Sequence, residues 1–71
     1  MDFSSYHKKF RERLTEHMQE KSILAFSKII GIPERTLYSW VNGEKFPGFE
    51  NLILLSMKFN CTTDYLLGIE D

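Results

Sequence analysis

Apolar side chains recur at steps of three and four residues along most of this chain, and that spacing predicts helices rather than strands. The first helix is expected over about residues 4–19, where Phe10, Leu14 and Met18 repeat among charged residues. No stretch of any length alternates apolar and polar residues as a half-buried strand does. Further helices are predicted over residues 23–30, about 33–41, 49–59 and 64–67. The pattern therefore predicts an all-α fold with five helices.

Residues that start and stop helices separate these stretches. Ser22 is expected to cap the second helix, because its hydroxyl can accept a hydrogen bond from a free N–H of the first turn. Gly31 can adopt the left-handed conformation that ends this helix. Pro33 is expected to fix φ in the first turn of the third helix, and Asn42-Gly43 to end it.

The same spacing predicts which faces are buried. The fourth helix is apolar nearly all round, so it is expected to be central and well buried. Phe3 and Tyr6 continue the apolar stripe of the first helix beyond Phe10, where they could cap the core or meet a partner. The inward-facing residues expected from the second to fourth helices are Phe26, Ile29, Ile30, Leu37, Trp40, Val41, Leu52, Ile53, Leu55, Met57 and Phe59.

The second and third helices are short and are joined by a tight turn at Gly31. Two such helices cannot cover each other's apolar stripes alone, so the remaining helices must cover them. A unit of this kind commonly presents its second helix outward, into the major groove of DNA. The residues predicted on that outer face are Glu34, Arg35, Tyr38, Ser39 and Asn42.

About two thirds of the chain resembles the Cro/cI-type, or XRE-like, helix-turn-helix family of phage repressors and small bacterial regulators. The resemblance implies a five-helix, lambda-repressor-like DNA-binding domain, with the helix-turn-helix over about residues 22–42. Each motif is weak alone, whereas their order and spacing together are specific. The matching residues are Ser22, Ile23, Phe26, Ile30, Gly31, Ile32, Pro33, Thr36, Leu37, Trp40, Asn42, Gly43, Pro47, Leu52 and Asp64-Tyr65-Leu66-Leu67-Gly68.

The resemblance implies that the start of the third helix faces base edges. Arg35 could donate two parallel hydrogen bonds to a guanine, and Glu34 could accept one from a cytosine amino group. Tyr38 and Ser39 lie one turn later and are expected to reach bases as well. The alternatives are that Glu34 and Arg35 are solvated charges and that Tyr38 packs against the second helix.

Phosphate contacts are expected from residues that flank the two helices. Each of them also has an ordinary role as a cap or as solvated surface. Many members of the resembled family carry a glutamine just after the cap of the second helix, where Ile23 and Leu24 stand here. Anchoring by the second helix is therefore less firmly predicted than anchoring by the loop after the third. The expected phosphate contacts are Ser22, Lys28, Thr36, Asn42 and Lys45.

The net charge of the 71 residues is −1, which argues against DNA binding, because a nucleic-acid-binding protein usually carries a basic surface. Residues 21–48 carry four cations and two carboxylates, whereas residues 49–71 carry one cation and four carboxylates. A mildly positive half and an acidic tail fit one face on phosphate and one face away from it. Weak non-specific binding is the consequence expected.

Length and composition predict one globular domain over residues 1–71. Cys61 is the single cysteine, expected to be a small buried apolar residue, so no internal disulfide can form. His7 and His17 form no spaced metal set with it, and no catalytic motif is present, so neither an enzyme, a metal nor a cofactor is expected. Without a signal-peptide pattern or a membrane-length apolar run, a cytoplasmic location is the default expectation.

Two hypotheses remain from the sequence. The first is a transcriptional regulator, specifically a repressor, that binds a double-stranded DNA operator as a weak homodimer. Its dimer interface is expected either at the Phe3/Tyr6 end of the first helix or at the fifth helix and tail. The alternative is an antitoxin-like or antirepressor-like protein-interaction module on the same fold, with Leu24 exposed to a partner.

Overall fold

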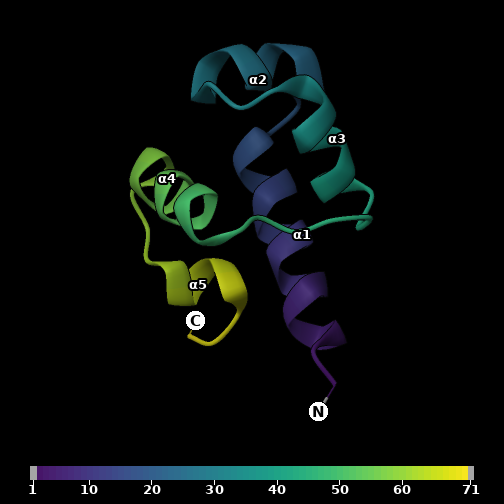
Figure 1. Cartoon of the computed structure of the whole chain (residues 1–71). Coiled ribbons are helices and arrows are strands. Elements are labelled where there is room, and N and C mark those ends of the chain that lie inside the picture. The colour runs from purple at the N-terminus through teal and green to yellow at the C-terminus, as the bar shows by residue number, and fades with distance from the viewer. Residues whose placement is uncertain (1, 71) are drawn as a thin grey trace.

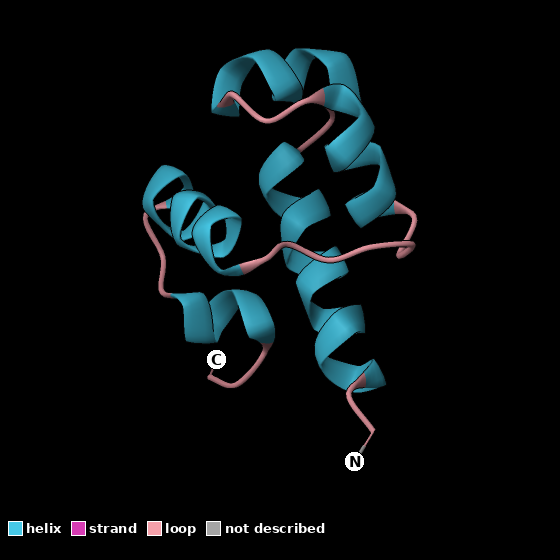
Figure 2. Cartoon of the chain, in the orientation of Figure 1, coloured by secondary structure: helices cyan, strands magenta, loops and turns pink. Residues whose placement is uncertain are grey.

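The computed structural model describes residues 2–70 and contains five helices. They are α1 (Ser4–Met18), α2 (Ile23–Ile30), α3 (Glu34–Val41), α4 (Phe49–Phe59) and α5 (Thr63–Leu67). The long helix α1 runs through the molecule, α2 and α3 gather at one of its ends, and α4 and α5 lie along one side (Figure 1). The remaining described residues form loops, and no strand occurs within residues 2–70 (Figure 2). The all-α, five-helix prediction is confirmed.

Local signals set most helix ends as predicted. The Ser22 hydroxyl accepts the N–H of Ala25 at 3.1 Å, which satisfies one free donor of α2. Gly31 ends α2 in the left-handed region, with φ of 77°. Pro33 differs from the prediction, because it immediately precedes α3 with an extended ψ of 142° instead of occupying its first turn.

The core joins residues from all five helices. Phe10, Leu37, Leu55 and Leu66 from α1, α3, α4 and α5 are fully or almost fully buried, and Phe26 brings in α2. Several helices must contribute because none of the short ones can bury its apolar stripe alone. The arrangement fixes which side of each short helix is left to solvent.

Helix α4 corrects the prediction of a central, well-buried helix. Only Leu55 on it is buried, whereas Ile53 and Met57 are 39% and 73% exposed. The reason is its position at the edge of the group: Leu52, Leu54, Leu55 and Phe59 pack in or against the core, and the opposite side of α4 is left to solvent. Ile29 on α2 was also predicted to face inward, and it is 57% exposed. Apolar content alone does not decide which side finds a neighbour.

The C-terminal helix is fastened to α1 by a buried cation. Arg13 is only 9% exposed, and its guanidinium lies 4.0 Å from the centre of the Tyr65 ring. It donates hydrogen bonds to the backbone carbonyls of Tyr65 and of Glu70, the latter at 3.0 Å. These bonds stabilise the burial of the charge and hold α5 and the following residues against α1. Cys61, expected to be buried, is only partly so and packs against the core.

Two glycines allow a matched test of how tightly the C-terminal end of α5 packs against α1. Gly31 and Gly68 both have φ of 77°, which costs alanine about 1–2 kcal/mol. A Cβ at Gly31 would meet no atom within 4 Å, whereas one at Gly68 would lie 2.7 Å from Cβ of Lys9. We expect Gly68→Ala to destabilise by roughly 1–3 kcal/mol more than Gly31→Ala in urea unfolding. Equal losses would show that α1 and α5 are not in close contact there.

Candidate nucleic-acid interface

Helix α3 is anchored by one face, so the opposite face is held toward solvent. Leu37 and Trp40 point inward at 0% and 2% exposure, and the ring of Phe10 meets Trp40 edge-on with centroids 6.3 Å apart. Arg11 on α1 donates from Nε to the carbonyl of Val41 at 3.3 Å, at the C-terminal end of α3. The rotation of α3 about its own axis is therefore fixed by burial.

The turn between α2 and α3 is rigid for local reasons. Ser27 on α2 donates its hydroxyl to the carbonyl of Ile32 at 2.6 Å, and the side chain of Ile32 is 3% exposed. The hydrogen bond and the buried side chain of Ile32 hold the angle between the two helices.

Within residues 2–70, no helix has the length and apolar character needed to cross a bilayer.

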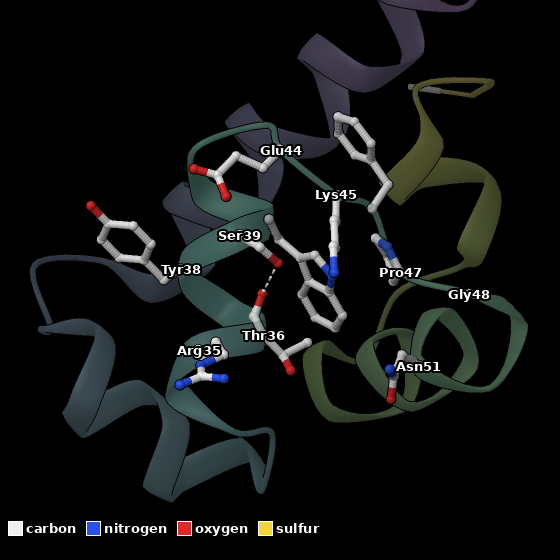
Figure 3. Close-up of a pocket in the computed structure, with 11 residues that line it drawn as sticks. Arg35, Thr36, Tyr38, Ser39, Glu44, Lys45, Pro47, Gly48 and Asn51 are labelled. Atoms are coloured by element: carbon white, nitrogen blue, oxygen red, sulfur yellow. Dashed lines mark hydrogen bonds between the residues drawn. The ribbon is translucent and has the colours of Figure 1, made fainter.

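A hollow of about 450 Å³ opens between α3, the loop that follows it and the start of α4. Figure 3 shows Thr36 on the side of α3 toward Asn51, with Lys45 extending from the loop and Arg35 beside Thr36 at the edge of the hollow. The lining includes the predicted contact residues Arg35, Thr36, Tyr38, Ser39 and Lys45. Residues from three segments of the chain thus form one surface.

The hollow offers several hydrogen-bond donors. Arg35 and Lys45 are exposed cations on it, opposed by the Glu44 carboxylate. Gly48 stands before α4 without a side-chain cap, and the N–H groups of the first turn of α4 have no acceptor within a helix. Gly48 and Asn51 line the hollow, so this positive helix end borders it. Such a combination suits an anionic ligand.

Ser39 is not on the outer face of α3 as predicted. It is 9% exposed, and its hydroxyl donates to the carbonyl of Thr36 at 2.7 Å. Its carbonyl accepts the N–H groups of Glu44 and Lys45, at 2.9 and 3.2 Å. Ser39 lies at the floor of the hollow, where α3 turns back toward its loop, and it shapes this loop. Its orientation corrects the prediction that it points outward to bases.

Apart from Ser39, some of the predicted contact residues line the hollow and the others lie outside it. Tyr38 is 55% exposed, and its ring projects away from Asn51, to the far side of α3 (Figure 3). Thr36 is half-buried. Glu34 is exposed at the first turn of α3, where its charge favours the positive end of the helix. Outside the lining of the hollow, the exposed candidates are Glu34, Ser22, Lys28 and Asn42.

Asn51 was missed from the sequence. It is the third residue of α4, partly exposed, and it lies across the hollow from Thr36 (Figure 3). Its amide can both donate and accept hydrogen bonds. The only available signal was the short Pro47-Gly48 connection, which brings the start of α4 back toward α3.

Comparison with known families agrees with this geometry. The family model described as helix-turn-helix matches residues 10–66, which is most of the chain and spans α2 and α3. Searches of curated proteins and of solved structures returned no match. That family comprises DNA-binding regulatory domains and not enzymes. The chain therefore belongs to the Cro/cI-type, XRE-like helix-turn-helix family and is a DNA-binding regulator of that type.

Proposed function

We propose that the protein is a sequence-specific repressor that reads the major groove of its operator with the outer face of α3. The observation that carries this is the position of Arg35, which is exposed on α3 while Leu37 and Trp40 are buried on the other side. Arg35 can donate two parallel hydrogen bonds to O6 and N7 of guanine. Bound at an operator, such a domain would repress by excluding other proteins from the site.

Phosphate contacts would hold α3 in register. Lys45 and the free N–H groups at the start of α4 are on one side of Arg35 in the hollow. Asn42 follows α3, and Ser22 stands at the positive end of α2. Contacts of this kind set orientation on the duplex without reading its sequence. Glu44 lines the same hollow and offsets one of its two cations, so the net positive charge there is small. Affinity for DNA would therefore depend on several neutral hydrogen-bond donors.

A single α3 contacts too few base pairs to select one site in a genome. We therefore propose that two copies bind a two-fold operator, with half-sites about one turn of DNA apart. The free protein would be a weak dimer, completed when both copies share one DNA.

Selection of binding sites from random duplex DNA with the purified protein tests the proposal. A repressor predicts an enriched motif with two-fold symmetry and at least one guanine per half-site that depends on Arg35. Pools that show no enrichment over input, at salt low enough for non-specific binding to be detected, would refute sequence-specific recognition.

Lys45→Ala tests the phosphate contacts separately. We expect it to weaken binding to every sequence alike, and to lower the slope of log K against log salt by about one unit. The reason is that a lysine on phosphate releases about one counterion. Fluorescence anisotropy at several salt concentrations measures both quantities.

Lys8→Ala is the matched control, because Lys8 is an exposed lysine on α1 outside the hollow. It removes the same charge from the protein. If Lys45→Ala and Lys8→Ala change the slope equally, the effect is one of net charge, and Lys45 does not contact phosphate.

The protein-interaction alternative depends on an apolar surface beside Arg35. Leu24 was its candidate, and Leu24 is indeed 49% exposed on α2. It does not line the hollow that contains Arg35. The apolar lining there, Trp40, Phe46 and Pro47, is buried or partly buried, whereas the cations Arg35 and Lys45 are exposed. This arrangement favours DNA over an apolar protein partner at that surface.

A further inference from the structure

Helix α4 carries a row of large apolar side chains that the rest of the described chain leaves wholly or partly exposed. Phe49, Ile53 and Met57 follow one another at intervals of one helical turn, and they are 79%, 39% and 73% exposed. Single exposed apolar residues are ordinary, but three in line on one helix form a continuous patch, and such patches mark interaction sites. We call these three residues the α4 stripe.

We propose that the α4 stripe is the surface through which two copies of this chain pair, with their α4 helices antiparallel about a two-fold axis. Residue spacing makes the stripe complementary to itself. If the two-fold axis passes through Ile53, then Ile53 of one copy meets Ile53 of the other, and Phe49 of each copy meets Met57 of the other. Thioether–aromatic contacts of that kind are favourable. A patch that matches its own copy in this way is what a two-fold interface requires.

Charge favours the antiparallel arrangement over the parallel one. Glu50 and Lys58 are exposed near opposite ends of α4. Antiparallel pairing directs each Glu50 toward the half of the partner helix that ends in Lys58, whereas parallel pairing would place like charges together. The positive N-terminal end of each helix also lies beside the negative C-terminal end of its partner.

The size of the stripe fits a weak dimer. Its three partly exposed residues present an apolar area of at most a few hundred Å² per copy, on the scale of about 150–250 Å² for a fully exposed aromatic side chain. Stable interfaces bury about 800 Å² per partner. A pair held by the stripe alone would therefore dissociate readily in solution and would form fully when both copies bind one DNA. The proposal rests on the proposed function for this last step only.

The position of the stripe suits the binding of both copies to one DNA. Phe49 directly follows Gly48, which lines the hollow beside Arg35, so the stripe begins at the edge of the proposed DNA surface. A two-fold pair formed there keeps the two hollows near each other. Recognition helices on a two-fold operator must lie about 34 Å apart, or a multiple of this distance.

A second apolar surface is the main competitor for this role. Phe3, Tyr6 and His7 on the α1 side, with Leu67 and Ile69 on the α5 side, line a groove of about 480 Å³. The two interfaces expected from the sequence are thus parts of one groove. It lies at the far end of a molecule 34 Å long from the α2–α3 end (Figure 1). Pairing there would hold the two α3 helices at the outer ends of the dimer.

Disulfide cross-linking without DNA tests the α4 stripe directly. Ile53→Cys in a Cys61→Ser background should form a disulfide-linked dimer under mild copper-catalysed oxidation, because the proposed axis passes through this residue. Glu16→Cys, at an exposed position of α1 outside both surfaces, is the negative control, and Tyr6→Cys is the control in the competing groove. Circular dichroism confirms folding of each variant. Efficient linkage at Ile53→Cys alone supports the proposal, and linkage at Tyr6→Cys alone overturns it.

Sedimentation equilibrium supplies an independent measurement with no engineered cysteine. Phe49→Ser/Met57→Ser should weaken self-association at least tenfold, whereas Phe3→Ser/Tyr6→Ser should leave it unchanged. All four side chains are exposed by 40% or more, so both variants should fold. A wild-type chain that is strictly monomeric at millimolar concentration would overturn the proposal and leave the stripe to a different protein. A dimer that binds no DNA would refute the proposed function and leave the interface standing.

Discussion

Trp40→Ala is expected to lower the free energy of unfolding by about 3–5 kcal/mol, which is most of what so small a domain has. The indole is 2% exposed and is in edge-on contact with Phe10, whose ring lies at 76° to it. Removing the indole forfeits its burial and leaves a cavity beneath α3, where the rest of the core cannot easily collapse. The variant is expected to be largely unfolded at 37 °C.

Urea unfolding followed by circular dichroism measures this loss. Tyr38→Ala is the control, because Tyr38 is an aromatic residue of the same helix that is 55% exposed, and its loss should be within about 0.5 kcal/mol. Similar losses for both variants would mean that α3 is rotated from the orientation described. In that case the assignment of Arg35 to the outer face would also be wrong.

Helix ends were predictable because they depend on neighbours in the sequence. Ser22 and Gly31 bound α2 through a hydroxyl cap and a left-handed φ, and both requirements can be recognised from residue type. The prediction of Leu37 and Trp40 as the inner face of α3 was confirmed because a short helix on a surface has one buried side. The outward position of Arg35 follows from the same reasoning.

The orientation of α4 was not predictable in this way. Its sequence places apolar residues on nearly every side, so periodicity cannot indicate which side meets the core. The packing of α5 against α1, through buried Arg13, decides where α4 has neighbours. The same holds for the hollow, since Ser39 and Asn51 take their places from the path of the loop between α3 and α4.

Arg35→Ala is expected to remove sequence discrimination at one or two base pairs of each half-site, by roughly 1–3 kcal/mol, or about 5- to 150-fold. The structure places the side chain on the exposed face of α3, beside Thr36 at the edge of the hollow (Figure 3). A guanidinium in that position presents two parallel donors, which match O6 and N7 of guanine and no other base edge as well. Competition binding with operator variants changed at one base pair at a time measures the loss.

Arg35→Lys separates base recognition from charge. Lysine keeps the positive charge but lacks the rigid pair of donors, so it should retain the salt dependence of binding and still lose much of the discrimination. If Arg35→Ala weakens binding to all sequences equally and Arg35→Lys restores it, Arg35 contacts phosphate. The reading of DNA would then have to come from other residues at the start of α3, of which Glu34 is the nearest exposed candidate. Loss at particular base pairs in both variants would instead identify Arg35 as the residue that selects the operator.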